Sequence, residues 1–543
     1  LFAESLVLLL SLFLIFRSLR GQPTWHSIII FFGIIPCSAI GKDAIYLVSV
    51  AAGAFTILRS NSSKVIPILI PGFLALLTLI KFSFASLSIV CITTLAIGAL
   101  ITRDKKRAAT ILGSYIGSFL LLWLLIGQNL LTIPAFFINS LQISQGYLWN
   151  MHQHEKLWVL GYLLFLLVIT SFPIFLTTLS KRKDATSWLT LIMAAGTIYL
   201  SWKAGTTRGG SHISIFMLSS FVVTFLIQPL LSKKVVSHAW VIALTICYFS
   251  GLAWVYPRGY EFIGDRVAKT ITHNIKFLYN PDILNKAFTE IIPLVILENE
   301  LPEFKKLIQD GSVDVLHYQQ SIALLNPFNF EPRPTVQNYP AYNQYLCRLN
   351  LEHIQKNPPD FLIVKTGSVD ARYPYSDDTL YNREVFQRYK PIATEKGYLL
   401  LEKRSSSVAI SFDSTVIQQT VSSGETVSID AWSNELLWLQ VDYSPSFMHR
   451  ILAFFYKPEM LHLKVTFEDE THKYFRLVGG NLKDGFMLNP IIESDAALAH
   501  FLNTHEVTKK ITHFSIHTVP GNTKFNTTEF GVKVSVHQSG ATP

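Results

Sequence analysis

The sequence predicts a polytopic α-helical membrane domain (about ten spans in residues 1–256) followed by two further domains. These are a small α/β domain and an antiparallel β-sandwich of jelly-roll-like topology. Three observations support this prediction. Half of the 543 residues are hydrophobic, which is more than a single soluble domain of this length holds. Long apolar runs occur only before residue 257, and short strand-like runs follow them.

Ten apolar runs have about the length that crosses ~30 Å of hydrocarbon. They are residues 4–16, 25–40, 44–58, 65–80, 83–102, 108–127, 157–179, 187–202, 212–231 and 236–256. The chain begins with Leu1 inside an apolar run, without a signal-peptide pattern. Further sequence, with further spans, is therefore expected upstream.

The basic residues of the loops predict the orientation of these spans. Every alternate loop is rich in Lys and Arg, so that 13 basic residues fall on one side and five on the other. The positive-inside rule places the 13 in the cytoplasm. The sequence therefore predicts a multi-pass protein of the bacterial inner (cytoplasmic) membrane whose C-terminal region is extracytoplasmic.

Charge also separates the two halves of the chain. Residues 1–256 hold 18 Lys/Arg and five Asp/Glu, a net charge of +13, and residues 257–543 hold 28 and 32, a net charge of −4. The basic character belongs to the membrane half, so it does not indicate nucleic-acid binding. Three of the four cysteines lie in apolar runs, and neither a disulfide framework nor a cysteine metal site is predicted.

Residues 257–290 are polar with helical character and predict a connector. In the small α/β domain over 291–406, short apolar runs predict strands and polar-apolar runs predict helices, giving a largely parallel sheet. The strands are expected at 291–297, 312–317, 321–325, 360–365 and 398–404, and the helices at 301–310 and 341–357. No glycine-rich phosphate motif follows a strand, so no nucleotide site is predicted.

Residues 407–543 alternate apolar and polar side chains between turn signals, which predicts the antiparallel sandwich. The strands are expected at 408–413, 425–431, 436–443, 461–469, 473–480, 514–519 and 530–537. Two helical insertions, at 445–457 and 495–505, interrupt them. The first carries enough aromatic residues to pack on the sheet or to lean on the membrane.

The stretch 201–212, SWKAGTTRGGSH, predicts a short polar loop between two spans on the outer side. Lys203, Arg208 and His212 stand within ten residues, and Gly205, Gly209 and Gly210 leave the backbone open to close approach. Cations at the membrane edge without nearby carboxylates favour an anionic ligand such as a phosphate. The alternative is a connecting loop whose basic residues reach to lipid headgroups.

Four more residues on the outer side carry charge: Glu4, Lys42, Asp43 and Lys81. Lys42 and Asp43 occupy a tight turn, where a site role or a simple ion pair is expected. Lys81 is isolated among apolar residues, and such cations are often functional, although one near a span end also reaches the headgroups.

The longest outer loop, residues 128–156, has loose helical spacing of apolar residues over about 131–146, which predicts a helix lying in the membrane interface. His152, His154 and Glu155 at its end fall short of a metal-binding pattern. No protein metal ligand is therefore assigned.

Four stretches resemble segments of a group of uncharacterised bacterial polytopic membrane proteins with a C-terminal extracytoplasmic domain. They are residues 139–151, 202–212, 333–346 and 485–492. The two-part plan is similar in layout to C-type glycosyltransferases, which use polyprenyl-phosphate-linked sugars, and to O-antigen polymerases and ligases. The acidic residue expected in the first outer loop of C-type enzymes has two alternatives: its loop precedes Leu1, or the residue is Asp43.

The resemblance implies a membrane-embedded transferase that moves a sugar or glycan from a polyprenyl-phosphate-type carrier on the outer face. Lys203, Arg208, Lys81 and Lys42 would then bind the lipid phosphate. Asp43 or Glu4 would be the general base, with His212 as the rival. No nucleotide or redox cofactor is expected, although a divalent metal is compatible with this chemistry.

The expected partners are the lipid bilayer, the polyprenyl-phosphate-linked substrate and protein partners in the membrane or periplasm, with no nucleic acid. The alternative is a non-catalytic scaffold subunit of a cell-envelope or surface assembly. A transporter is less favoured, because the spans show neither an inverted repeat nor paired broken helices.

Overall fold

The computed structural model describes residues 2–60, 63–180, 185–228, 234–255, 282–519 and 529–537, together with short pieces between 264 and 280. The chain divides into two compact units, and each is described by itself. Unit 1 comprises Leu1–Phe137 and Gln153–Asn280, and unit 2 comprises Ile138–His152 and Pro281–Pro543. The second unit is thus assembled from two separate parts of the chain.

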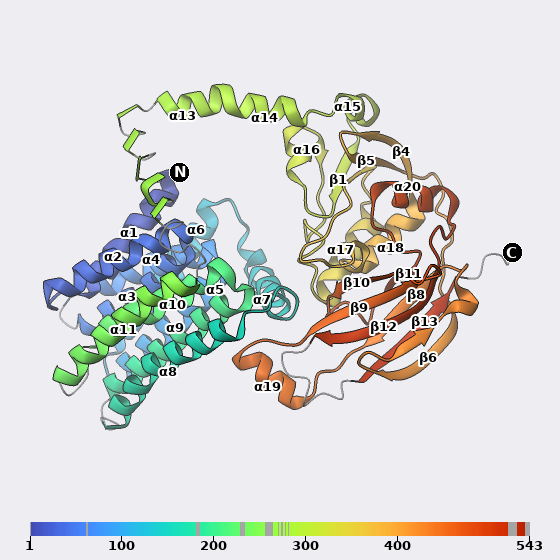
Figure 1. The fold of residues 1–543 in the computed structure, drawn as a ribbon. Helices are drawn as coiled ribbons and strands as arrows, with labels where there is room; N and C mark the ends of the chain where they lie inside the picture. The colour runs from blue at the N-terminus through green and yellow to red at the C-terminus, as the bar shows by residue number, and fades with distance from the viewer. Residues whose placement is uncertain are drawn as a thin grey trace. The chain divides into compact units, whose positions relative to one another are not determined.

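Unit 1 is helical, and each of the ten apolar runs forms a helix (Figure 1). These helices are α1 (Phe2–Ser18), α2 (Thr24–Ile40), α3 (Asp43–Arg59), α4 (Ile66–Ile80), α5 (Phe82–Ile101), α6 (Lys105–Leu125), α8 (Leu157–Ser180), α9 (Ala185–Arg208), α10 (Ile213–Ile227) and α11 (Lys234–Val255). Among the described residues, five segments are long and apolar enough to cross a membrane, namely Phe82–Ile101, Lys105–Leu125, Leu157–Leu176, Gly210–Ile227 and His238–Val255. Thr24–Pro36 and Ile66–Ile80 are shorter apolar segments.

Hydrogen bonds and ion pairs show that the connections of unit 1 alternate between its two ends. At one end, Arg59, the last residue of α3, donates to the carbonyl of Ser18 at 2.9 Å and to the carbonyl of Leu226 in α10. At the other end, the starts of α1 and α3 are joined by an ion pair between Glu4 and Lys42. The helices α1, α3 and α10 therefore run in the same direction. The basic residues 181–183 and 233, which were assigned to the first end, lie outside the described residues.

The prediction of a polar loop over residues 201–212 is wrong for most of that range, because α9 continues to Arg208. The hydroxyls of Thr206 and Thr207 donate to carbonyls four residues earlier, at 2.7 and 2.6 Å, so they are satisfied within the helix. Gly205 lies against Phe216, with a notional Cβ 3.0 Å from that side chain. Close packing between α9 and α10 thus keeps a polar, glycine-containing sequence helical.

The helix predicted in the long outer loop is present, although its place in the membrane interface stays a prediction. A 3-10 turn, η1 (Leu130–Thr132), leads into α7 (Ile133–Asn150). The first turn of α7 belongs to unit 1, where Phe136 and Phe137 contact Trp123 and Phe119 of α6. The remainder of the same helix belongs to unit 2.

Unit 2 contains a five-stranded mixed sheet in the order β2-β1-β3-β5-β4. The strands are β1 (Ser312–Leu316), β2 (Asn329–Phe330), β3 (Phe361–Val364), β4 (Tyr389–Glu395) and β5 (Tyr398–Lys403). β1 pairs in parallel with β2 and β3, whereas β5 is antiparallel to β3 and β4. The expected largely parallel sheet is therefore parallel in only one half. The helices of this region are α15 (Pro302–Ile308), α16 (Ser321–Leu325), α17 (Gln344–Lys356) and α18 (Thr379–Arg388).

Two strands predicted for this region are wrong. Residues 321–325 form α16, and residues 291–297 belong to a helix made of α13 (Asp282–Lys286), the π-helical η4 (Ala287–Ile291) and α14 (Ile292–Asn299). Pro293 stands in the first turn of α14, where a missing N–H is harmless. A short apolar run has no period that separates a strand from a helix.

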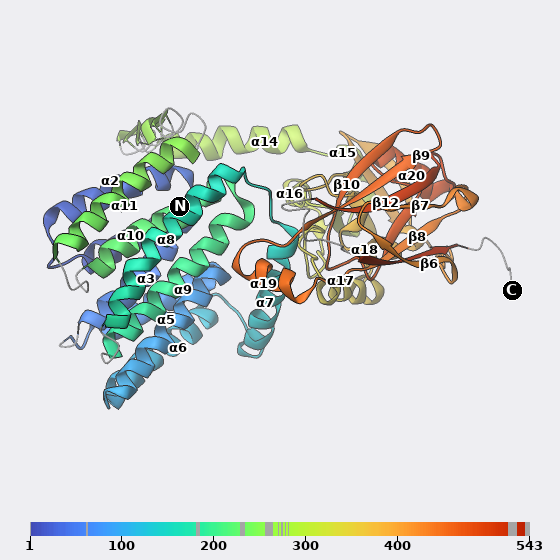
Figure 2. The ribbon, with the colours of Figure 1, turned by 60° about the horizontal axis from the view of Figure 1, so that its bottom comes forward.

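The C-terminal part of unit 2 holds two four-stranded sheets with antiparallel pairing, β10-β9-β12-β7 and β11-β8-β13-β6 (Figure 2). The strands are β6 (Ser414–Ser422), β7 (Thr426–Ser428), β8 (Leu437–Asp442), β9 (Met460–Phe467), β10 (His472–Leu477), β11 (Phe486–Asn489), β12 (Ile511–Val519) and β13 (Glu529–Val536). Both sheets and the sheet of the α/β region contribute to one hydrophobic cluster. The expected boundary at residue 406 thus separates strands that share a core.

Both helical insertions are confirmed, as α19 (Phe447–Phe455) and α20 (Asp495–Thr504). The strand predicted at 408–413 is wrong, because these residues are irregular. Ile410 is nevertheless buried in the core, so the apolar residues of this stretch serve packing rather than strand pairing.

Candidate functional site

The candidate site lies at the end of unit 1 where α1, α3 and α10 begin. Asp43, the first residue of α3, forms an ion pair with Lys81 at the junction of α4 and α5. Both side chains are about half exposed, at 40% and 50%. The pair is therefore accessible, and its net strength as a stabilising contact is small.

His212 and Arg208 belong to the same group of charges. His212 ends the 3-10 turn η2 (Gly210–His212) that connects α9 with α10, and the charges of Lys81, Arg208 and Asp43 all act on its ring. Arg208 is the last residue of α9, where a cation complements the exposed carbonyls of the helix end. The structure thus brings Asp43, Lys81, Arg208 and His212 together from three separate places in the sequence.

The second carboxylate assigned to the site, Glu4, lies beside this group. Its Oε1 is 2.6 Å from Nζ of Lys42, and both side chains are about half exposed. Tyr46, one turn into α3, experiences the charges of both Glu4 and Asp43. Both candidate bases are therefore paired with lysines that were expected to bind phosphate, and both pairs remain accessible.

The glycine backbone after Arg208 is not open in the way the sequence suggests. Gly209 adopts φ 63°, and Oε1 of Glu155 would lie 1.3 Å from a Cβ at this position. The same oxygen accepts a hydrogen bond of 3.1 Å from the N–H of Gly210. A carboxylate already faces these glycines, so a phosphate cannot approach them from that side without repulsion. An anion would have to be bound through the side chains of Arg208 and Lys81 instead.

Lys203 stands five residues before Arg208 on the same helix. At 3.6 residues per turn the two side chains leave α9 in directions that differ by about 140°. A role for Lys203 beside Arg208 stays a prediction.

Metal binding has no structural support in the part of the chain that the structure describes. Its residues include no group of three His, Cys, Asp or Glu side chains placed to hold a metal ion. His152 belongs to unit 2, whereas His154 and Glu155 belong to unit 1.

A second cluster of functional interest, which the sequence did not predict, holds the C-terminal end of α7 inside unit 2. The carbonyl of Asn150, the last residue of α7, accepts hydrogen bonds from Arg372 at 2.6 Å and from Arg476 at 2.9 Å. Arg372 also pairs with Asp377 at 3.1 Å, and Arg476 pairs with Asp370 at 3.6 Å. Two cations at a helix C-terminus complement its dipole. This arrangement, the arginine clamp, fixes α7 to unit 2.

The rest of the α7 contact is close and polar. A Cβ at Gly146 would lie 2.4 Å from Tyr342, so only glycine fits there. Asn343 donates to the side chain of Gln142 at 3.0 Å, and Tyr345 donates to Asn139 at 2.9 Å. The stretches 139–151 and 333–346, which were singled out only by resemblance, are therefore packed on each other.

A buried charge network lies behind this contact. Arg333 is fully buried and pairs with Asp314 at 2.8 Å and with Asp378 at 3.6 Å. Burial raises the pKa of Asp378 to about 7, although Arg333 and a hydrogen bond from Asn350 oppose this shift. Asp314 already balances the Arg333 charge, so a second buried carboxylate is protonated readily.

Comparison of this chain with protein-family models, with curated proteins and with solved structures finds no match.

Proposed function

We propose that the chain is a membrane-embedded transferase that moves a sugar or glycan from a polyprenyl-phosphate-type carrier on the outer face of the bacterial inner membrane. The observation that supports this proposal best is the convergence of Asp43, Lys81, Arg208 and His212 at one end of the helical unit. Two cations can hold a lipid phosphate and stabilise its charge, and a carboxylate or an imidazole can act as general base.

In the proposed reaction the bond between the sugar carbon and the phosphate oxygen breaks as an acceptor hydroxyl attacks that carbon. Lys81 and Arg208 hold the phosphate and stabilise the negative charge that the departing lipid phosphate gains. Asp43 takes the proton of the acceptor hydroxyl, with Glu4 and His212 as the alternatives. Lys42 and Lys203 belong to the wider basic surface that attracts the lipid phosphate.

The proposal includes the finer architecture. The helices α1 to α6 and α8 to α11 would all span the membrane, with the ends that carry Asp43 and Arg208 on the outer side. The two C-terminal sheets would form the jelly-roll-like sandwich outside the cytoplasm. The 13-to-5 distribution of basic loop residues supports this orientation.

The test uses the full chain in lipid nanodiscs. Binding of undecaprenyl phosphate is measured by native mass spectrometry for the parent and for Arg208→Ala, Arg208→Lys and Lys81→Ala. We expect Arg208→Ala to weaken binding about tenfold and Arg208→Lys to weaken it less, since the charge remains but the planar fork is lost. Lys105→Ala, which changes an exposed lysine at the opposite end of the unit, is the matched control.

Transfer is measured separately, as movement of radiolabelled hexose from a polyprenyl-phosphate donor to the glycans of a membrane extract. Asp43→Asn should keep lipid binding and lose transfer. The proposal is wrong if Arg208→Ala and Lys81→Ala bind the lipid phosphate as the parent does.

A non-catalytic scaffold is the second candidate, and the pairing of both Asp43 and Glu4 with lysines favours it. In that case Asp43→Asn and Arg208→Ala would leave the surface glycan unchanged in cells, whereas deletion of the chain would alter it.

A further inference from the structure

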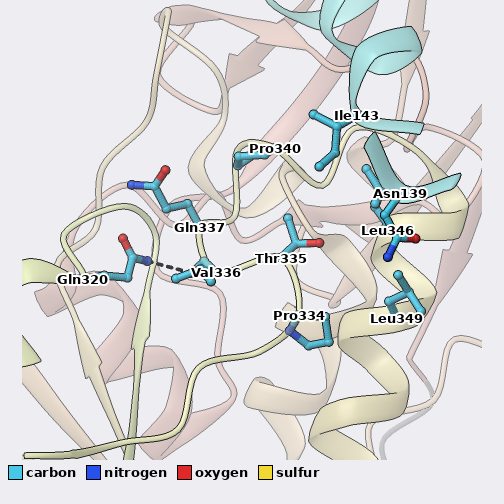
Figure 3. A pocket seen from close by; sticks show the side chains of 10 residues that line it. All are labelled: Asn139, Ile143, Gln320, Pro334, Thr335, Val336, Gln337, Pro340, Leu346 and Leu349. Carbon is cyan, nitrogen blue, oxygen red and sulfur yellow. Dashed lines mark hydrogen bonds between the residues drawn. The ribbon is translucent and has the colours of Figure 1, made fainter. Parts of the chain in front are cut away.

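A pocket of about 410 Å³ lies in unit 2, at the edge of the mixed sheet where the parallel strands end. Gln320 lines it from the segment after β1, and residues 334–337 line it from the segment after β2 (Figure 3). In open sheets with parallel strands, ligands bind outside the carboxyl ends of these strands. The volume is within the range of small-molecule sites.

One polar group in the pocket lining is buried without a partner. Gln320 is 9% exposed, and its Nε2 donates to the carbonyls of His317 and Val336, each at 2.9 Å. Its Oε1 has no hydrogen-bond partner among the described residues. This oxygen is itself buried, so it lies inside the wall of the pocket and not at its surface. The two bonds of Nε2 to main-chain carbonyls hold this wall in place.

Hydrogen-bonding groups of three other residues line the pocket. The Oδ1 of Asn139 accepts a bond from Tyr345, which leaves its Nδ2 as a donor, and in Figure 3 the hydroxyl of Thr335 is directed toward the wall that carries Asn139. Gln337 donates through Nε2 to the carbonyl of Tyr318 at 3.1 Å, so that its Oε1 can accept. The lining thus offers both donors and acceptors.

The lining residues are neutral, and this decides the class of ligand. The amides and the hydroxyl alternate with the apolar surfaces of Ile143, Pro334, Pro340 and Leu349. A phosphate or another anion would find no cation in this lining, because the charge of Arg333 behind it is balanced by Asp314. Rings that present hydroxyls at their edges and C–H groups on their faces match such a surface.

We propose that this pocket binds a neutral hexose or disaccharide unit of the acceptor glycan. The inference rests on the proposed function, since it assigns the substrate that receives the transferred sugar. Gln337, Asn139 and Thr335 would bind its hydroxyls, and Leu346 and Leu349 of α17 would contact its apolar face.

The test is saturation-transfer NMR with the full chain in nanodiscs and a panel of neutral sugars, namely glucose, galactose, mannose, N-acetylglucosamine and their β-linked disaccharides. We expect at least one to bind at up to about 10 mM. Thr335→Val keeps the main-chain bonds of Thr335 to Asn350 and removes only the hydroxyl, and it should weaken binding about fivefold. Leu349→Trp should fill the pocket and abolish binding.

Arg348→Ala, an exposed change on the same helix, is the control and should bind like the parent. Absence of binding by every sugar of the panel, or unchanged binding by Leu349→Trp, overturns the inference. So does binding of a palmitate probe that Leu349→Trp abolishes while no sugar competes, because the pocket would then be an acyl-chain site. Arg208→Ala should retain sugar binding and Leu349→Trp should retain binding of undecaprenyl phosphate, so failure here is distinguishable from failure of the proposed function.

Discussion

The guanidinium of Arg372 donates a hydrogen bond of 2.6 Å to the main-chain oxygen of Asn150, 222 positions earlier in the sequence. Arg476, 326 positions after Asn150, donates to the same oxygen. A single carbonyl at the end of α7 is thus the meeting point of three distant segments. The stability of this part of unit 2 should depend on that point.

The first prediction concerns the arginine clamp. Arg372→Met keeps much of the side-chain volume but leaves the buried carboxylate of Asp377 without its partner, and breaking a buried pair costs about 3–5 kcal/mol. We expect hydrogen exchange of the last two turns of α7 in the full chain to become at least about tenfold faster, with α6 unchanged. The exposed change Arg348→Ala is the control. Unchanged exchange in α7 would show that the clamp does not hold the helix.

Gly146 gives an independent prediction about the same contact. A methyl group at this position would lie 2.4 Å from Tyr342, so Gly146→Ala should separate α7 from the 339–346 segment, despite the higher helix propensity of alanine. Ser144→Ala, an exposed change two residues away, should be neutral or slightly stabilising. Hydrogen exchange of the α7 amides in the full chain measures the contact, and it should become faster in Gly146→Ala only. Equal exchange in both variants would contradict the prediction.

The buried aspartates predict an unusual dependence of stability on pH. An unfolded aspartate loses its proton near pH 4, whereas burial raises the pKa of Asp378 to about 7. Between these values the folded chain binds a proton that the unfolded chain has lost. The contribution of Asp378 to stability therefore falls as pH rises from about 4 to 7, by about 1.4 kcal/mol per unit.

Asp378→Asn should remove this slope, because asparagine tolerates the observed φ of 53° and carries no proton to lose. The measurement is the opening free energy of α18 amides by hydrogen exchange at pH 5 and pH 7. Asp360→Asn is the control. Burial opposes the charge of Asp360, but hydrogen bonds from Ser312 and Lys403 lower its pKa. The contribution of Asp360 to stability is therefore constant between pH 5 and pH 7. Asp314→Asn should lower stability at both pH values, since Arg333 then depends on Asp378 alone.

Substitution of Gly209 tests how tightly the connection between α9 and α10 is confined. Its backbone, at φ 63° and ψ −156°, is in a region that other residues avoid, and a side chain there would meet Glu155. Gly209→Ala should therefore destabilise the detergent-solubilised chain by about 1–3 kcal/mol. Gly210→Ala also requires a positive φ but has open space around it, and it should cost less. A thermal shift that is equal for the two variants would show that Glu155 does not confine the loop.

The orientation of the chain is the last prediction. Alkaline phosphatase, which is active only outside the cytoplasm, should be active when fused after Pro543 and inactive when inserted in the basic loop at residues 103–107. The physical reason is the excess of basic residues in every alternate loop. The opposite pattern of activity would invert the topology.

The sequence predicted the helices of unit 1 well, because an apolar run long enough to span a bilayer has one stable backbone conformation in lipid. Short elements were harder to assign. Residues 321–325 and 291–297 are apolar and bounded by polar residues, as both a short strand and a short helix can be. β6 and β11 were not expected at all, since β6 is rich in Ser, Thr and Gln and β11 has four residues.

The candidate site was predicted in composition but not in geometry. Spacing in the sequence places Arg208 and His212 together, yet only the folded chain shows that Asp43 and Lys81 join them. The position of Glu155 against Gly209 was likewise hidden, because the two residues are brought together by the packing of separate helices. The arginine clamp had no local signature, since a carbonyl can be an acceptor anywhere in a chain.

Because unit 2 is discontinuous, its parts leave the ribosome at different times. Residues 138–152 are synthesised first, and residues 153–280, with the apolar helices α8, α9, α10 and α11, are synthesised before the remainder of unit 2 exists. During this interval the end of α7 lacks Arg372, Arg476 and Tyr342. Unit 2 can therefore be completed only after every residue of unit 1 has been synthesised, and translation itself imposes this order.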